Sequence, residues 1–289
     1  MTENIRENKM GTQNINSLLL SMAIPMMISM LVQALYNIVD TMFVSRLGQD
    51  ALTALSLAFP VQNFLIAVGV GTGVGVNALL SRSLGEKNTE RANRTAENGI
   101  FLFIISSIVV MLFGIFCVKP YFQSFGTTEN IAELGTDYLS ICMIFSIGLF
   151  GQIMYEKLLQ STGKTAYSMI VQLAGAVINI ILDPIMIFGY FGLPAMGVTG
   201  AAIATVTGQI IAHFVGIFIN RKFNREISIS LKNVVKPDGE IIKRIYSVGF
   251  PSLCMASIGS VMNVGLNQII NFLKKFLYLL FHWSVPPFP

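Results

Sequence analysis

The chain has 289 residues, of which 53% are hydrophobic and only 12% are charged, and its mean hydropathy is +0.67. A soluble domain carries roughly 25% charged residues, so this chain has too few charges to cover a globular surface. The composition excludes a soluble domain, and a net charge of only +4 does not point to a nucleic-acid partner. We expect a polytopic membrane protein that is not an enzyme and uses no cofactor.

Several apolar stretches are long enough to cross a membrane, which takes about 20 residues each. They lie at residues 18–44, 54–80, 99–118, 138–159, 166–190 and 199–219, and a last one begins near 245 and fades near 270. Because lipid offers the backbone no hydrogen-bond partner, each stretch should be a helix. The predicted fold class is all-α, a polytopic membrane helical bundle of about seven transmembrane helices, formed by a six-helix lobe and one further helix.

Lysine and arginine gather in alternate connections between these spans. They lie in the N-terminal tail and after the second, fourth and sixth spans, whereas the other side carries Arg46 and Lys119. Positively charged short loops stay in the cytoplasm, so we expect a multi-pass protein of the cytoplasmic membrane with a cytoplasmic N-terminus. Basic residues between 221 and 244 would face anionic head groups, which makes the lipid bilayer an expected partner.

A weak internal repeat suggests how the chain divides. Positions 21, 23, 25 and 37 hold Ser, Ala, Pro and Asn, and the positions 226 residues later hold Ser, Gly, Pro and Asn. The repeat indicates a second copy of one helical unit. We predict a cytoplasmic tail at 1–17, a six-helix lobe at 18–219, a basic cytoplasmic connector at 220–244 and the first helix of an incomplete second lobe at 245–270. Residues 271–289 would be an atypical tail, which we expect to be artificial or out of frame.

Two acidic residues lie inside predicted spans, Asp40 late in the first and Asp183 late in the fifth. The helical face of Asp40 also carries Gln33, Tyr36 and Asn37. A carboxylate in hydrocarbon is costly and is a functional hypothesis by default. Both helices run in the same direction and hold their carboxylate in the outer half, so the two could share one cavity. The alternative is that each residue marks an outer interface.

The fifth span carries further polar groups beside Asp183. Asn179 and Gln172 lie on the same face, and Pro184 follows directly. A proline cannot donate its amide, so the helix should bend there and free a backbone carbonyl. Carbonyl, carboxylate and amide oxygens together would suit a hard cation or a proton. Sodium could therefore bind at Asp40, Asn179 and Asp183, or the proline only shapes the packing.

Small and polar residues in other spans have two interpretations each. The alternating glycines at 69–75 lack the lysine of a phosphate loop and favour close helix contact. Thr205 belongs to a polar stripe of the sixth span, which either lines a cavity or bonds neighbouring helices. Glu156 adjoins Lys157 near the end of the fourth span, which predicts an interfacial ion pair.

Four segments carry a resemblance to a known family. They are PMMISMLVQALYNIVDTMFVSRLG from residue 25, GVGVNALLSRSLGEKN from 73, NIILDPIMIFG from 179 and GVTGAAIATVTGQ from 197. They resemble the multidrug and toxic compound extrusion transporters, most closely the bacterial multidrug-efflux branch. The resemblance covers about residues 15–270. It implies a twelve-helix transporter of two lobes that exports small organic, often cationic, compounds in exchange for H+ or Na+, and relative to it this chain would be truncated.

The resemblance also implies roles for individual residues. Asp40 matches the family's acidic residue of the first helix, and Asn179 and Asp183 match its pair in the fifth. In relatives these belong to a cation-coupling and substrate-linked site. Tyr138 resembles the family's tyrosine near that site, and Thr205 is a weaker match.

Other functions remain open at this point. The chain could be an inactive truncated or frameshifted product, or a lipid-linked precursor flippase of related architecture, for which more basic residues inside the spans would be expected. An intramembrane aspartyl protease would need a GxGD-like setting, which Asp183 lacks. If the lobe works without a second one, two copies would have to associate.

Overall fold

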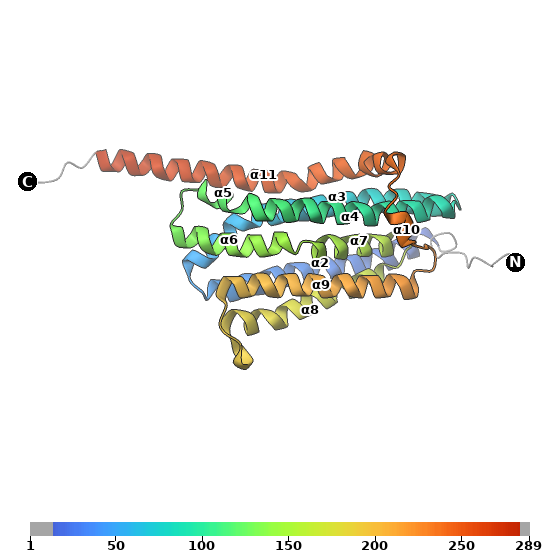
Figure 1. Cartoon of the computed structure of the whole chain (residues 1–289), viewed down its shortest axis with the longest axis horizontal. Helices are drawn as coiled ribbons and strands as arrows, with labels where there is room; N and C mark the ends of the chain where they lie inside the picture. Colours follow the sequence, from blue (N-terminus) through green and yellow to red (C-terminus); the bar gives the residue numbers. More distant parts are fainter. Residues whose placement is uncertain (1–13, 284–289) are drawn as a thin grey trace, which may run out of the picture.

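The computed structural model describes residues 14–283, apart from the side chains of residue 231 and of most residues after 258. The described elements are all helices, and the long ones run side by side along one axis (Figure 1). In chain order they are α2 (Ile15–Ser45), α3 (Gln49–Gly85), α4 (Thr89–Phe116), α5 (Val118–Gln123), α6 (Glu129–Ile144), α7 (Ile147–Ser161), α8 (Thr165–Phe188), the 3-10 helix η1 (Tyr190–Gly192), α9 (Gly197–Phe223), α10 (Leu231–Val234) and α11 (Gly239–Trp283).

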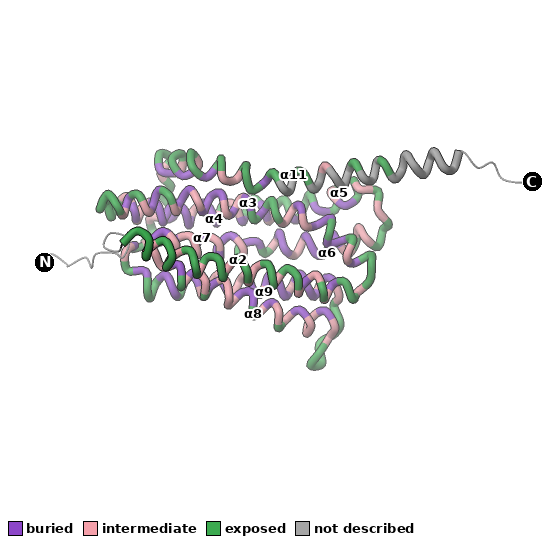
Figure 2. The backbone as a smooth tube through the Cα atoms, turned by 180° about the vertical axis from the view of Figure 1, so that it is seen from behind, coloured by how far each residue is buried: buried purple, intermediate pink, exposed green. Residues whose placement is uncertain are grey.

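The helices have the length and polarity of membrane spans. Five described helices (α2, α3, α4, α8 and α9) are long and apolar enough to cross a membrane, and the number is six if α6 and α7 count as one bent span. The all-α membrane bundle that the sequence predicted is therefore confirmed. Figure 2 shows α2 largely exposed, and its exposed side chains include Leu20, Met27 and Met30. An apolar outer face of this kind suits lipid rather than water.

The fourth span differs from the single helix expected at 138–159. It begins at Glu129, breaks after Ile144, resumes at Ile147, and bends by 47°. Two small residues at the break explain the bend. The hydroxyl of Ser146 donates to the carbonyl oxygen of Ser107 (3.4 Å), and a Cβ on Gly148 would lie 2.9 Å from the backbone nitrogen of Ile210. The bend thus brings the start of α7 against α4 and α9.

Helix α11 also corrects the expected boundaries. It runs from Gly239 to Trp283 and so extends beyond both ends of the apolar stretch at 245–270. Asp238 caps its start, because the Asp238 carboxylate accepts the amides of Glu240 (2.9 Å) and Ile241 (3.3 Å). The tail predicted beyond residue 283 and the first 13 residues of the N-terminal tail lie outside the described residues.

The segment that joins α9 to α11, residues 224–238 (the linker), is fixed to α4 by buried polar groups. Glu97 Oε1 accepts the Ser230 amide (3.0 Å) and the Asn233 side-chain amide (3.1 Å). Asn98 Oδ1 accepts the Asp238 amide (2.8 Å). We call this side of the bundle the linker end; the α3–α4 and α7–α8 turns also lie there, and the other side is the loop end (Figure 1).

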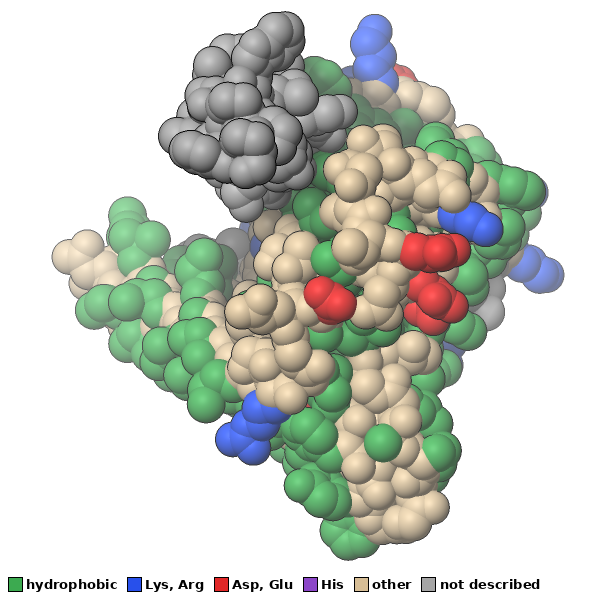
Figure 3. All heavy atoms as spheres, turned by 90° about the vertical axis from the view of Figure 1, so that its left-hand side faces the viewer, with side chains coloured by type: hydrophobic (Ala, Val, Ile, Leu, Met, Phe, Trp, Pro, Cys, Tyr) green, Lys and Arg blue, Asp and Glu red, His purple; other side chains and the backbone are tan. Residues whose placement is uncertain are grey.

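Glycines bring α3 and α11 into close contact. A Cβ on Gly71 would lie 2.6 Å from Leu253 Cβ, and one on Gly249 would lie 2.6 Å from the carbonyl oxygen of Gly71. The close helix contact predicted from the alternating glycines is therefore confirmed: Gly71 and Gly75 pack against α11, whereas Gly69 and Gly73 pack against α7. Figure 3 views the loop end and shows hydrophobic side chains on the flanks of the molecule, with acidic side chains gathered near its middle.

Candidate functional site

The two intramembrane carboxylates meet at the interface between α2 and α8, which pack directly against each other. Asp40 is 4% exposed and Asp183 is completely buried. Within α2, which is described along its whole length, Asp40 and Val44 are the buried residues. The charges of Asp40 and Asp183 are close enough to interact. The two carboxylates, which the sequence places at similar depths, thus lie near each other between two packed helices.

Asn179 links this pair to α9. Its side-chain amide donates to Asp183 Oδ1 (3.4 Å), one turn along α8, and to Thr205 Oγ1 (3.2 Å). Asn179 is 2% exposed and Thr205 4%. Tyr36 of α2 lies against Thr205 and interacts electrostatically with both carboxylates. Three helices therefore contribute to one buried polar site, and Thr205 bonds Asn179 within it.

Three oxygens of the site have no hydrogen-bond donor: Asp40 Oδ1, Asn179 Oδ1 and Asp183 Oδ2 are all buried and unpartnered. Buried polar atoms are normally paired, so such a group of acceptors requires an explanation. None of the lysines or arginines that the structure describes forms an ion pair with either aspartate. A cation or a proton would relieve both the missing hydrogen bonds and the repulsion between two carboxylates.

Helix α8 continues through Pro184 to Phe188 without a break. The bend we expected at this proline therefore does not interrupt the helix. Carboxylate and amide oxygens remain as ligands, and all-oxygen sets suit hard cations. The residues present thus fit a sodium ion or a proton.

Tyr138 lies close to the aspartate site. It is 2% exposed, its hydroxyl accepts a hydrogen bond from the Gln62 side chain (3.3 Å), and it interacts electrostatically with Asp40 and Tyr36. Gln62 of α3 also contacts the sulfur of Cys142 (3.5 Å). We did not single out Gln62 from the sequence, because a lone glutamine in an apolar run gives no spacing signal.

Two expected residues of the first span lie elsewhere. Asn37 is exposed on α2, and its described hydrogen bond is made by its backbone oxygen, which accepts from Thr41. It lies three residues before Asp40, and therefore some 60° around the helix, which is enough to turn its side chain outward. Gln33 faces inward but bonds with Gln172 of α8 instead of the aspartates.

The prediction of an ion pair between Glu156 and Lys157 is wrong, because the two side chains bond elsewhere. Lys157 Nζ donates to Gln160 Oε1 (3.0 Å), and Glu156 Oε1 accepts from Gln152 (3.0 Å). Adjacent residues of a helix point about 100° apart, so a neighbour in sequence is a poor ion-pair partner. Glu156 thus faces the interior of the bundle.

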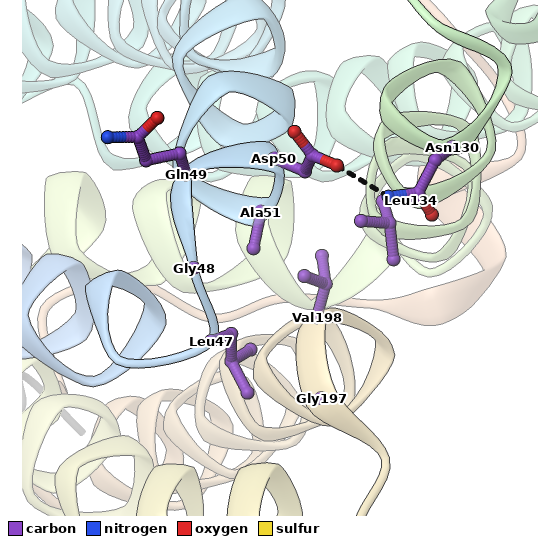
Figure 4. Close-up of a pocket in the computed structure, with 9 residues that line it drawn as sticks. All are labelled: Leu47, Gly48, Gln49, Asp50, Ala51, Asn130, Leu134, Gly197 and Val198. Carbon is purple, nitrogen blue, oxygen red and sulfur yellow. Dashed lines mark hydrogen bonds between the residues drawn. The ribbon is translucent and has the colours of Figure 1, made fainter.

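A separate cavity of about 500 Å³ opens at the loop end (Figure 4). Asn130 donates to Asp50 (2.7 Å) across it. It is lined by Leu47, Gly48, Gln49, Asp50, Ala51, Asn130, Leu134, Gly197 and Val198. Because neither Asp40 nor Asp183 lines it, this cavity is a surface hollow distinct from the buried polar site.

A helical membrane bundle with a buried polar site between its spans has the architecture of a membrane transporter. A family model, MatE, matches residues 25–185, more than half of the chain. The chain therefore belongs to the MatE family of transporters, and the resemblance seen in the sequence is confirmed.

Individual relatives agree with this assignment. The FAD transporter of Shewanella oneidensis is 31% identical over 198 residues, which are 68% of this chain and 44% of that protein. The multidrug export protein MepA of Staphylococcus saprophyticus is 29% identical over 249 residues, 86% of this chain and 54% of that protein. A solved MOP superfamily transporter from Pyrococcus furiosus superposes with a TM-score of 0.79 at 29% identity, covering 86% of this chain and 54% of that chain. The chain thus spans about half the length of the relatives it matches.

Proposed function

We propose that the protein exports small organic compounds, cationic ones among them, across the cytoplasmic membrane in exchange for H+ or Na+. The observation that carries this proposal is the set of three buried, unpartnered oxygens of Asp40, Asn179 and Asp183. An antiporter needs a site that is stable with a cation and costly without one. Two buried carboxylates without a basic partner meet this requirement.

The residues of the site have different roles in this proposal. Asp40 and Asp183 bind the coupling ion, and the oxygen of Asn179 completes the set. Thr205 orients Asn179 by accepting its amide hydrogen (3.2 Å). Because Asp40 is on α2 and Asp183 on α8, loss of the cation leaves repulsion across a helix interface. That repulsion favours separation of the two helices, which is how ion release could open the site to substrate.

The charge of the site supports cationic substrates over anionic ones. One relative is named for FAD, an anion, and another for multidrug export. The described surroundings of Asp40 and Asp183 include no lysine or arginine that interacts with them. A phosphate-bearing substrate would lack a partner there. The same argument disfavours a flippase for lipid-linked precursors.

Orientation is part of the proposal. The basic residues place the linker end in the cytoplasm, with Asp40 and Asp183 in the outer half of the membrane. In this arrangement residues 18–219 form one transport lobe, residues 220–244 connect it, and residues 245–270 begin a second.

Efflux of ethidium, a fluorescent organic cation, tests the function. The full-length protein and its Asp40→Asn variant are expressed in a host without other drug pumps, and membrane abundance is matched. We expect D40N to abolish efflux, because the amide keeps the size of the side chain but cannot carry its charge. Asp50→Asn is the matched control, since Asp50 is exposed at the loop end, and it should transport normally. Normal efflux by D40N would refute the proposal.

A further inference from the structure

A second polar cluster joins α2, α7 and α8 on the linker side of the aspartate site. The side-chain amide of Gln152 donates one hydrogen bond to Glu156 (3.0 Å) and one to Gln172 (3.1 Å). Gln172 in turn donates to Gln33 of α2. We call these four residues the glutamine cluster. The carboxylate of Glu156 is its one charged member.

The charge of Lys157 acts on Glu156, but the two side chains do not form an ion pair. None of the ion pairs that the structure describes includes Glu156, and its neighbour Lys157 donates to Gln160 instead. The described hydrogen-bond donor of Glu156 is Gln152, which is 8% exposed. A carboxylate held inside a span by a neutral amide is costly unless a cation visits it.

The cluster lies on the same polar seam as the aspartates. Ser168, Gln172, Asn179 and Asp183 are spaced four, seven and four residues apart along α8, so they share one face. Ser168 is 2% exposed and accepts from Gln160 (3.1 Å), which extends the seam to the linker end. Asp183 and Gln172 are separated by roughly 16 Å along the helix axis.

Two glycines lie between the aspartate site and the glutamine cluster. A Cβ on Gly175 would lie 3.7 Å from Gln152 Oε1, and one on Gly208 would lie 3.2 Å from Asn179 Cβ. The two glycines also face each other, since a Cβ on Gly208 would lie 2.8 Å from the Gly175 carbonyl oxygen. Helices α8 and α9 therefore pack closely at these two glycines, with the backbone oxygens of both helices between the aspartate site and the glutamine cluster.

We propose that Glu156 is a second binding residue for the coupling cation, placed between the aspartate site and the linker end. This inference rests on the proposed function, because it assumes that Asp40 and Asp183 bind the cation first. The cation then passes along the α8 seam to Glu156, where the amide oxygens of the glutamine cluster are its further ligands. Oxygen ligands of this kind accept either a sodium ion or a hydrated proton.

Cation-driven exchange by the full-length protein in proteoliposomes tests the proposal. Tetraphenylphosphonium exchange is driven in one arm by a sodium gradient at constant pH and in the other by a pH gradient without sodium. Glu156→Gln keeps the oxygen to which Gln152 donates but removes the charge. We expect E156Q to slow exchange by about tenfold or more in the arm that drives the wild type, with equilibrium tetraphenylphosphonium binding within about twofold. Glu133→Gln is the matched control, because Glu133 is exposed on α6.

Two further variants separate the outcomes. A cluster that only ties helices together would leave E156Q active and inactivate Gln152→Ala, whereas a cation-binding role makes E156Q slow and lets Glu156→Asp recover part of the rate. Wild-type exchange by E156Q beside an inactive D40N overturns the role of Glu156 and leaves the proposed function intact. Wild-type exchange by D40N overturns the proposed function itself.

Discussion

Asp40 of α2 and Asp183 of α8 are buried carboxylates on packed neighbouring helices, and their charges interact. No described ion pair offsets either charge. Asp40 and Val44 are the buried residues of α2, so the inner contact of this helix includes one of the two carboxylates. Whatever binds at this pair therefore also affects how α2 packs on α8.

Asn179 should matter for ion coupling more than for folding. Replacing it with Leu removes both the hydrogen bond to Asp183 and the one to Thr205, and it also removes the unpartnered amide oxygen. We expect gradient-driven exchange to fall by about tenfold. Thr205→Val removes only the acceptor from α9, so its loss should be smaller. Equal activity of N179L and wild type would contradict the role of Asn179.

The site could be predicted from the sequence where the physical signal was local. Asp40, Asn179 and Asp183 stand out because acidic and amide groups inside apolar runs carry a large desolvation cost. Glu97 and Glu156 gave no such signal. Glu97 lies near the charged start of its helix, and its partners at residues 230 and 233 are far away in the chain. Glu156 was paired with the residue next to it, although its actual neighbours come from one turn away and from α8.

Helix boundaries were less predictable than helix positions. Hydropathy marks the apolar centre of a span, whereas α4 begins at Thr89 with a polar first turn that the apolar stretch at 99–118 does not include. The Asn88 side chain fixes that start by accepting the amide of Arg91 (3.0 Å). The bend between α6 and α7 was also hidden, because the residues on either side are equally apolar.

Glu97 should hold the linker on α4. Replacing it with Ala leaves the Ser230 amide and the Asn233 side chain without their acceptor, which costs about 1–3 kcal/mol. We expect faster amide hydrogen exchange at residues 228–238 in E97A. Glu90→Ala is the control, because Glu90 is exposed in the first turn of the same helix. Unchanged protection of the linker in E97A would show that Glu97 does not fix it.

The contact between α3 and α11 should tolerate no side chain at Gly71. A Cβ there would lie 2.6 Å from Leu253 Cβ, so Gly71→Ala must push the helices apart, at about 1–3 kcal/mol. Thermal unfolding in detergent should show a lower Tm for G71A. Gly85→Ala serves as the control, because a Cβ there meets nothing within 4 Å. Equal Tm values for the two variants would contradict the close packing.

The stability of the linker end should depend on pH because of Glu86. A hydrogen bond from Arg82 lowers the pKa of this carboxyl, and the charges of Arg82, Arg91 and Arg244 lower the pKa further. A pKa that is lower in the folded state stabilises the fold above the unfolded pKa and loses that effect as pH falls through the folded pKa. Wild type should thus unfold at a slightly higher Tm than Glu86→Gln at pH 7. The difference should shrink as the pH falls below the usual pKa of glutamate and vanish below the lowered pKa of the folded state. A constant difference would exclude this cause.

Direct cation binding tests the central claim, that Asp40 and Asp183 form one cation site. Purified wild-type protein is compared with the Asp40→Asn, Asp183→Asn double variant in detergent, with bound radioactive sodium and the protons released on adding tetraphenylphosphonium as readouts. We predict that the wild type binds sodium or releases protons and that the double variant does neither, while its Tm is unchanged or higher because the repulsion is gone. Wild-type sodium binding or proton release in the double variant would contradict the account.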